Sequence, residues 1–538
     1  MQKRIGISIL LGATLAVSAL HASAADDKSD KKKDDKPAET VKASDVQADS
    51  TTEGTVTVGG QTIAYTAVAG TLTVAATNTQ DALLGLDGKW LPDAGVKTDK
   101  PDDEPATARI FYTAYFKKPV AGVLRPVTFL YNGGPGSATM WLHMGSFGPR
   151  RVVTSDTLHD AAAPYKIVNN DYSLLDVSDL VFIDAPATGF SRIFGKNKED
   201  AFFGLDPDAH AFERFIRRFL TKYNKWNSPK YLFGESYGTP RSAVLSSDLE
   251  NVDLNGIILL SAILSFDNSA DGPTDNPGVD QAYALALPTY AASAWYHHKL
   301  TNPPATLEPL LAEVEKYALG DYMTALLQGS ELPEAQRQAV AAKLHDYTGL
   351  PVAYLLKSNL RVPGGAFSKT LQEPEGLTTG RLDTRYQGPD YDPLSQGADY
   401  DPQSNAISSA YTTAINEYMR TELKYGENWT YKPSGREPGF KWPFRQSEGG
   451  PNVMPDLAQT MKANPKTKIL LAGGYYDLAT PFFEGMYEMH HLPIPQSLQA
   501  NISYKYYQAG HMIYVNEPIL KQFHDDVAAF IKGTEAAK

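Results

Sequence analysis

The stretch 231-YLFGESYGTPRS-242 constrains the fold of this chain more than any other part of the sequence. An apolar run typical of a buried strand ends at Gly234, a helix-forming sequence begins at Thr239, and Ser236 lies between them. Glycines flank the serine because backbone atoms in so sharp a turn approach too closely for side chains. The pattern predicts a strand, a tight turn and a helix, with Ser236 presented at the tip of a sheet.

Strand and helix patterns alternate on both sides of this stretch. Short apolar or alternating runs predict strands at 54–74 with a turn at Gly59-Gly60, and at 109–116, 126–131, 180–184, 230–233, 256–261, 468–472 and 502–507. Apolar residues at helical spacing predict helices at 206–224, 239–248, 307–327, 334–347 and 518–531. Strands that alternate with helices predict an α/β fold built on a mostly parallel central sheet.

Composition divides the chain into five predicted parts. They are a signal peptide (1–24), a disordered tether (25–52), the first part of an α/β core (53–280), a helical and loop-rich cap insertion (281–454) and the second part of the core (455–538). The signal peptide has a basic start, an apolar run shorter than the roughly 20 residues of a membrane span, and small residues at Ala22-Ser23-Ala24. The tether is rich in Asp, Lys and Ala and has too few apolar residues to order itself.

The N-terminal pattern predicts export to the periplasm or medium of a bacterium, with no membrane anchor after signal cleavage. The sequence has no cysteine, which excludes disulfides, thiolate metal sites and a cysteine nucleophile. Its formal net charge is −12 and its basic residues are dispersed, so nucleic acid is not an expected partner. No pattern indicates an oligomeric state.

Residues 234–238 fit the G-x-S-x-G pattern of a nucleophilic serine. A serine hydroxyl needs a base to take its proton, and on such a fold an acid and a histidine follow the serine in chain order. Asp477 follows one predicted strand and His511 follows the next. Because parallel strands place their carboxyl ends at one edge of a sheet, we expect Ser236, Asp477 and His511 to meet there.

Other late acids and histidines are expected to be structural. His490, His491 and His524 lie on predicted helices, and Glu484 and Glu488 are expected on the surface of a helix.

The glycine-rich loop in 129-FLYNGGPGSATMWL-142 directly follows another predicted strand. Its glycines allow the close backbone approach that N–H donors to an oxyanion require. Taken alone, the loop also fits a phosphate-binding turn, although it lacks the Lys-Ser/Thr of a P-loop.

Five motifs, in their order along the chain, resemble the serine carboxypeptidase family, which has the α/β-hydrolase fold. They are NGGPGS at 132–137, NDYS at 170–173, FIDAPATGFS at 182–191, GESYG at 234–238 and GHM at 510–512. The resemblance implies that Ser236 is the nucleophile, that His511 is the general base and acid, and that Asp477 orients the imidazole. It implies a peptide substrate, no cofactor and no metal.

The resemblance also implies roles for residues around the serine. Gly134 and Tyr237 would supply the N–H groups of the oxyanion hole. Asn132, Gly133 and Glu235 would bind the free C-terminal carboxylate of a peptide. A carboxyl group can hydrogen-bond to a carboxylate only when one of the two carries a proton, so this binding would favour mildly acidic pH.

Two positions depart from the family pattern. The family pairs the equivalent of Glu235 with a second glutamate, whose position is occupied by Ser146, and its usual cysteine after NGGPG is Ser137. Without the second glutamate the requirement for a free carboxylate is weaker. An esterase or acyltransferase using the same triad is therefore an alternative function, and a catalytically silent binding protein is a third.

The sequence Asp-Tyr-Asp-Pro occurs twice, at 390–393 and 399–402. Clustered carboxylates are typical calcium ligands, but the spacing is not that of an EF-hand loop. We interpret the repeat as an acidic loop stiffened by proline.

Overall fold

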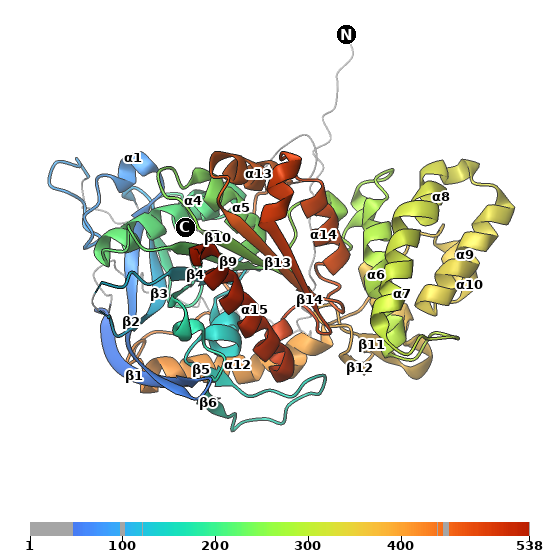
Figure 1. Ribbon diagram of the computed structural model, residues 1–538, viewed down its shortest axis with the longest axis horizontal. Coiled ribbons are helices and arrows are strands. Elements are labelled where there is room, and N and C mark those ends of the chain that lie inside the picture. Colours follow the sequence, from blue (N-terminus) through green and yellow to red (C-terminus); the bar gives the residue numbers. More distant parts are fainter. Residues whose placement is uncertain (1–46, 97–102, 121, 438, 445–450, 537–538) are drawn as a thin grey trace, which may run out of the picture. The chain divides into compact units, whose positions relative to one another are not determined.

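A large β-sheet organises the computed structural model, which describes residues 47–96, 103–120, 122–437, 439–444 and 451–536 (Figure 1). Within these residues the sheet has ten strands, which are β1 (Ser50–Val58), β2 (Gln61–Ala75), β3 (Thr107–Lys117), β4 (Val127–Tyr131), β7 (Asp179–Ile183), β8 (Arg192–Phe194), β9 (Lys230–Glu235), β10 (Gly256–Leu260), β13 (Lys468–Gly474) and β14 (Ile502–Tyr507). Two small strand pairs lie outside it, β5 (Arg150–Val152) with β6 (Ile167–Asn169) and β11 (Leu377–Thr379) with β12 (Gln387–Pro389).

The strand order is β1-β2-β3-β7-β4-β9-β10-β13-β14, with β8 paired to β3. The pairs from β7 to β14 are parallel, and those from β1 to β7 are antiparallel. The predicted mostly parallel sheet and the hairpin that turns at Gly59-Gly60 are therefore confirmed. In this order the carboxyl ends of β4, β9, β13 and β14 lie along the same edge, where ligands of such sheets bind.

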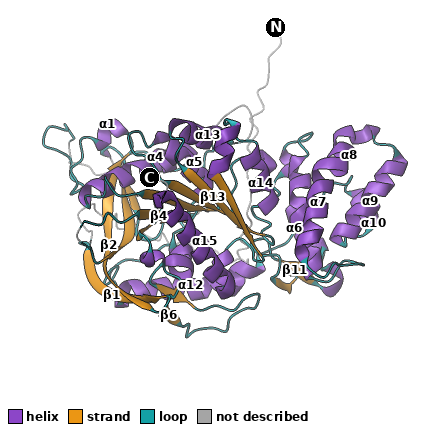
Figure 2. Cartoon of the chain, in the orientation of Figure 1, coloured by secondary structure: helices purple, strands orange, loops and turns teal. Residues whose placement is uncertain are grey.

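Helices cover both faces of the sheet (Figure 2). They are α1 (Asn78–Asp81), α2 (Met140–Leu142), α3 (Lys198–Phe202), α4 (Leu205–Lys222), α5 (Gly238–Asp248), α6 (Gln281–Tyr296), α7 (Leu307–Tyr317), α8 (Met323–Gln328), α9 (Glu334–Thr348), α10 (Val352–Lys357), α11 (Gly364–Thr370), α12 (Pro402–Thr421), α13 (Met454–Ala463), α14 (Phe482–His490) and α15 (Glu517–Ala536). Two π-helical turns, η2 (His143–Phe147) and η6 (Ala318–Tyr322), continue α2 and α7.

Alternating residues of the central strands enter two different hydrophobic clusters. On β4, Phe129 and Tyr131 pack with α4, α5 and α13, whereas Leu130 packs with α12 and α15. All five residues of β4 are buried. This is the pattern expected of a strand that is covered on both faces, since successive side chains point to opposite sides.

The predicted cap insertion does not behave as one unit. Helices α6 to α11 form a third hydrophobic cluster, which also includes Tyr476 and Leu478. Helix α12 instead packs its apolar residues, Ile407 and Ile415 among them, into a cluster of the central sheet. No helix was predicted here, because the acidic, proline-rich stretch just before Pro402 obscures the start of the helix. At that start the Asp401 side chain accepts a hydrogen bond from the Ser404 N–H at 2.6 Å.

Two further boundaries differ from the prediction. The signal peptide and most of the tether lie outside the described residues, but β1 begins at Ser50, inside the predicted tether. Asp49 binds Lys222 at 2.6 Å, which explains why this polar segment is ordered. The single helix predicted at 307–327 is interrupted by η6, a π-helical turn that periodicity alone does not reveal.

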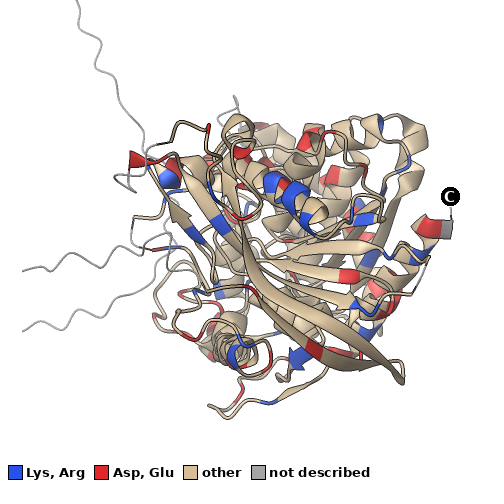
Figure 3. Cartoon of the chain, turned by 90° about the vertical axis from the view of Figure 1, so that its left-hand side faces the viewer, with Lys and Arg blue, Asp and Glu red and all other residues tan. Residues whose placement is uncertain are grey.

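Basic and acidic residues are interspersed over the elements seen in Figure 3. Several buried charges are paired, as in Arg241 with Asp208 at 2.6 Å and Lys369 with Asp390 at 2.7 Å. In the part of the chain that the structure describes, no helix is both long and apolar enough to span a membrane. No group of three or more histidines and acids among these residues is arranged to hold a metal ion.

Candidate active site

Ser236 lies where β9 ends and α5 begins. Its φ is +60°, in the left-handed region where a residue other than glycine is strained. Ser236 is half-buried, whereas every other residue from 230 to 246 is buried. A Cβ at Gly234 would collide with the backbone of Gly238, so the turn requires glycine there. The serine is therefore the exposed point of an otherwise buried strand-turn-helix unit, next to the positive end of a helix dipole.

The loop after β4 packs directly on this turn. A Cβ on Gly133 would strike the backbone nitrogen atoms of Tyr237 and Gly238, so only glycine permits the approach. Gly134, next in the loop, has a φ of +112°. The backbone of the glycine-rich loop and the first N–H groups of α5 are thus brought side by side.

A buried ion pair fixes the position of that loop. Arg241 on α5 donates to the Asn132 carbonyl oxygen at 2.7 Å and binds the Asp208 carboxylate at 2.6 Å. The side chains of Arg241 and Asp208 are fully buried. Arg241 was not predicted from the sequence, although it is the one basic residue of α5 and lies five residues after the serine.

Asp477 and His511 lie together at the ends of β13 and β14. His511 Nδ1 is 2.8 Å from an Asp477 carboxylate oxygen and 3.2 Å from the Thr480 hydroxyl. The other Asp477 oxygen accepts the N–H groups of Ala479 and Thr480 at 2.9 and 3.0 Å. Both side chains are buried, so the aspartate is held in one orientation and faces the histidine.

His511 is also hydrogen-bonded to the residue that follows β10, the strand next to β9. The Ser261 hydroxyl, just beyond β10, donates to the His511 carbonyl oxygen at 2.8 Å. Burial lowers the pKa of His511, but Asp477 and Glu235 raise it by more, so the pKa lies above its ordinary value.

Glu235 is buried beneath the serine. The Tyr514 hydroxyl donates to its two carboxyl oxygens at 2.9 and 3.2 Å, and Asn132 is a further hydrogen-bonding neighbour. Burial raises the pKa of Glu235 to about 7, although His511 and these hydrogen bonds oppose the shift. At mildly acidic pH this carboxyl group therefore carries a proton.

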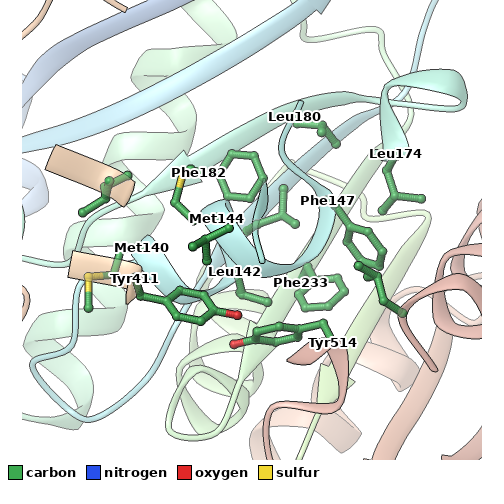
Figure 4. Packing of buried hydrophobic residues seen from close by; sticks show 14 of the residues in the cluster. Met140, Leu142, Met144, Phe147, Leu174, Leu180, Phe182, Phe233, Tyr411 and Tyr514 are labelled. Carbon is green, nitrogen blue, oxygen red and sulfur yellow. The ribbon is translucent and has the colours of Figure 1, made fainter. Parts of the chain in front are cut away.

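Tyr514 belongs to an aromatic group at the edge of a hydrophobic cluster (Figure 4). Tyr411 of α12 lies beside it, and the ring of Tyr514 packs against Gly145, where a Cβ would collide with both tyrosines. Tyr514 was not predicted from the sequence, because no pattern marks a tyrosine three residues after a histidine as the partner of a glutamate 279 residues earlier.

Ser146 does not replace the second carboxyl group that the family pattern has at this position. It is fully buried in η2, and its hydroxyl donates to the Leu142 carbonyl oxygen one turn earlier, at 2.6 Å. Its own carbonyl oxygen accepts the Asn170 side-chain amide at 2.6 Å. The serine is thus engaged in local hydrogen bonds that hold the helix turn.

Residues of the motifs at 170–173 and 182–191 bind the backbone that follows the glycine-rich loop. Asp184 accepts the Thr139 N–H at 2.8 Å and the Tyr431 hydroxyl at 3.1 Å. Asn170 and Ser173 bind the carbonyl oxygens that end η2, including that of Phe147 at 2.8 Å. These residues therefore act on the site through the backbone that they hold.

Comparison with known proteins gives one partial match. Residues 101–269, which include the glycine-rich loop and the serine turn, match the family model of serine carboxypeptidases. The match covers less than half of the chain, which over these residues is similar to serine carboxypeptidases. The fold is α/β, with a mostly parallel central sheet and helices on both faces.

One solved structure with a similar arrangement is Kex1(delta)p, a prohormone-processing carboxypeptidase from Saccharomyces cerevisiae. It is 16% identical to this chain in sequence, and the match covers 87% of this chain and 91% of that chain with a TM-score of 0.47. A proline iminopeptidase from Mycobacterium smegmatis has 13% identity over 80% of this chain and 96% of that chain, with a TM-score of 0.34. An esterase from Exiguobacterium antarcticum has 10% identity over 79% and 96%, with a TM-score of 0.30. No curated protein sequence matches this chain.

The expectation that Glu484 and Glu488 lie on a helix surface is wrong. Both are fully buried on α14, which packs against α6 and β13. Glu488 accepts the N–H groups of Leu264 and Ser265 at 2.7 Å each, whereas neither carboxyl oxygen of Glu484 has a partner among the described residues. Burial raises the pKa of Glu488 to about 7, and burial together with Glu488 and nearby acids raises the pKa of Glu484 well above its ordinary value.

A neutral replacement of Glu484 should stabilise the protein at alkaline pH. Because the folded state holds the proton more tightly than the unfolded state, folding stability is lost as pH rises above the ordinary carboxyl pKa. We expect Glu484→Gln to unfold near the wild-type temperature at pH 5 and several degrees higher at pH 8. Thermal unfolding measured at both pH values, with exposed Glu417→Gln as control, tests this. An equal shift at the two pH values would show that Glu484 is ionised in the folded protein.

Proposed function

We propose that this protein is a serine carboxypeptidase, which releases C-terminal residues from peptides through an acyl-enzyme on Ser236. The observation that carries the proposal is the buried Asp477–His511 pair at 2.8 Å, on the sheet edge where Ser236 is the exposed residue of its turn. A buried acid and histidine at that edge provide the base that a serine hydroxyl needs.

In the proposed reaction, the Ser236 oxygen bonds to the carbon of the scissile carbonyl while its proton passes to Nε2 of His511. Nδ1 of the same ring stays bonded to Asp477, which stabilises the imidazolium. The N–H groups of Gly134 and Tyr237 would stabilise the oxyanion. The close packing of Gly133 on Tyr237 supports this assignment, since it brings the two backbone segments together.

When the tetrahedral intermediate collapses, the carbon–nitrogen bond breaks and the proton on His511 passes to the leaving amine. A water molecule then attacks the ester carbon of the acyl-enzyme and gives a proton to His511. Breaking of the ester bond returns that proton to Ser236, so the enzyme is regenerated. The shortened peptide leaves as a carboxylic acid, which loses its remaining proton to solvent.

Glu235 gives the proposal its exopeptidase character. With a pKa of about 7, its carboxyl group carries a proton at mildly acidic pH and can donate it in a hydrogen bond to the C-terminal carboxylate of a peptide. Asn132, a hydrogen-bonding neighbour of Glu235, and the backbone of Gly133 would complete this binding site. The active form carries a proton on Glu235 and none on His511.

A second candidate is an esterase or acyltransferase that uses the same three residues. It is favoured by one observation, the engagement of the Ser146 hydroxyl in its own helix, which leaves Glu235 without a second carboxyl group beside it. A weaker carboxylate site relaxes the requirement for a free C-terminus.

Covalent labelling tests the nucleophile. A fluorophosphonate should modify Ser236 in the wild type, and Ser236→Ala should not react. Asp477→Asn should lower kcat by about 10³ to 10⁴, because the amide supports the wrong histidine tautomer. Ser247→Ala, on the far end of α5, is the control and should react normally. Folded wild-type protein in which Ser236 stays unmodified would support a catalytically silent binding protein.

The pH dependence of peptide and ester hydrolysis separates the two candidate functions. For a blocked dipeptide, kcat/KM should fall above pH 7 by up to about tenfold per pH unit, because Glu235 loses its proton and repels the substrate carboxylate. A simple ester has no such carboxylate, so its kcat/KM should reach a plateau instead. The dipeptide amide should be hydrolysed poorly at all pH values from 4 to 8.

Glu235→Gln is the matched control, since its amide donates a hydrogen bond at every pH. This variant should abolish the decline above pH 7 for the dipeptide. For the ester it should keep the plateau and move the acidic limb to lower pH, because Glu235 no longer raises the pKa of His511. Hydrolysis of the ester without hydrolysis of the dipeptide would favour the esterase or acyltransferase.

We also propose that the chain is exported and that cleavage after Ala24 releases it to the periplasm or medium. The basic start, apolar run and small residues before position 25 support this. Mass spectrometry of the protein secreted from a bacterial host should give a mature N-terminus at Ala25. A protein that retains Met1 in the exported fraction would contradict the proposal.

A further inference from the structure

Residues 381–385 of the insertion lie between the two loops that carry Asp477 and His511. This segment, Arg381-Leu382-Asp383-Thr384-Arg385, comes from the sequence between β10 and β13 and is not adjacent in sequence to either loop. Three of its five residues are buried. Its hydrogen bonds reach both loops.

The segment binds the aspartate loop on both sides of Asp477. The Leu478 N–H donates to the Arg381 carbonyl oxygen at 3.0 Å, and the Thr384 N–H donates to the Tyr476 carbonyl oxygen at 2.9 Å. The residues before and after the aspartate are thereby fixed to one short piece of chain.

The same piece of chain binds the histidine loop. The His511 N–H donates to the Leu382 carbonyl oxygen at 2.6 Å, and the Gly510 N–H donates to an Asp383 carboxylate oxygen at 3.1 Å. A Cβ on Gly510 would collide with Asp383, so glycine is required for this approach.

Buried charges hold the segment itself. Asp383 is 1% exposed and binds the Arg385 guanidinium at 2.6 Å, and Arg385 also binds Asp156 at 2.9 Å. Asp156 also accepts a hydrogen bond from the Asn516 side-chain amide at 2.6 Å, so the chain that follows His511 is bound to the Asp383, Arg385 and Asp156 group. If one member of this group were removed, its buried partners would be left with an uncompensated charge.

A second carboxylate anchors the start of the segment. Asp401, at the N-terminus of α12, accepts the N–H groups of Arg381 and Leu382 at 2.7 and 2.9 Å. The segment is therefore fixed at both ends and bonded to both loops in its middle.

We propose that residues 381–385 set the distance between Asp477 and His511, and that Asp383 is the positioning residue that holds the histidine loop against the aspartate loop. This inference rests on the proposed roles of Asp477 and His511. The two residues follow neighbouring strands, and the two loops also contact each other directly through the Tyr476 N–H, which donates to the Ala509 carbonyl oxygen at 3.0 Å, and through Thr480. The segment at 381–385 adds hydrogen bonds on both sides of Asp477 and to Gly510 and His511, next to the 2.8 Å contact. A displacement of about 1 Å in such a pair is enough to cost catalysis about 10²-fold.

Two substitutions of Asp383 test the proposal with the ester substrate and with the rate of fluorophosphonate labelling at Ser236. Asp383→Ala removes the acceptor for the Gly510 N–H and the partner of Arg385, so kcat and the labelling rate should fall at least tenfold while KM changes less than twofold. Asp383→Asn keeps a carbonyl acceptor for Gly510 and should recover part of the lost rate.

The pH profile supplies a readout that stability alone does not change. The charged groups around His511 are Asp477, Glu235 and Arg381, which remain in these variants, and Asp383 itself, whose carboxylate accepts the N–H of the adjacent Gly510. Asp383→Ala and Asp383→Asn both remove the Asp383 charge, so the difference between them reports the contact between His511 and Asp477. If Asp383→Ala loosens this contact, the apparent pKa of the acidic limb for ester hydrolysis should fall further in Asp383→Ala than in Asp383→Asn, because Asp477 no longer raises it fully.

Lys369→Met is the matched control. Lys369 forms an equally buried ion pair with Asp390 at 2.7 Å in the same insertion, and its other hydrogen bond goes to the Asp392 carbonyl oxygen. This variant should lose thermal stability but keep the wild-type kcat and apparent pKa. The proposal is overturned if Asp383→Ala also loses only stability.

Should Asp383→Ala not fold, Arg385→Lys provides the same test, since a lysine cannot bind Asp383 and Asp156 through a planar fork. It should reduce kcat in the same way, and a wild-type kcat with a wild-type pH profile would overturn the proposal. The ester and the labelling reagent need no C-terminal carboxylate. Failure of carboxypeptidase activity would therefore leave these results interpretable.

Discussion

The contact between the turn after β9 and the loop after β4 determines the geometry of the whole site. Two backbone segments meet there without side chains between them, because Gly133 lies against Tyr237 and Gly234 lies against Gly238. Arg241 completes the contact by joining the helix that follows the serine to the carbonyl oxygen of Asn132. Because the serine and the glycine-rich loop are bound to each other in this way, neither can move alone.

Several buried carboxyl groups have raised pKa values. Glu235, Asp184, Glu484 and Glu488 all have raised pKa values because they are buried. Each group near neutrality can carry a proton at slightly acidic pH at little cost in stability. The apolar surroundings of such groups tolerate neutral carboxyl groups far better than charged ones.

The sequence was sufficient for the features that depend on local pattern. Buried strands such as β4 and β9, the hairpin at Gly59-Gly60 and the turn at Ser236 follow from short apolar runs and glycine positions. The sequence was not sufficient where the burial of a residue depends on contacts with distant parts of the chain. Glu484 and Glu488 are spaced like a solvated helix face, and only the packing of α14 on α6 and β13 shows otherwise. The contacts of Tyr514 and Asp383 join residues more than a hundred positions apart, which no local pattern encodes.

The order of the site residues along the chain has a consequence for synthesis. The serine turn and the glycine-rich loop are complete by residue 248, but the segment at 381–385, Asp477 and His511 are made later, and His511 follows the last strand of the sheet. A chain that is still being synthesised thus holds a serine without its base. Under the proposed mechanism, hydrolytic activity appears only when the final strand has joined the sheet, so an unfinished molecule cannot attack the peptides that surround it.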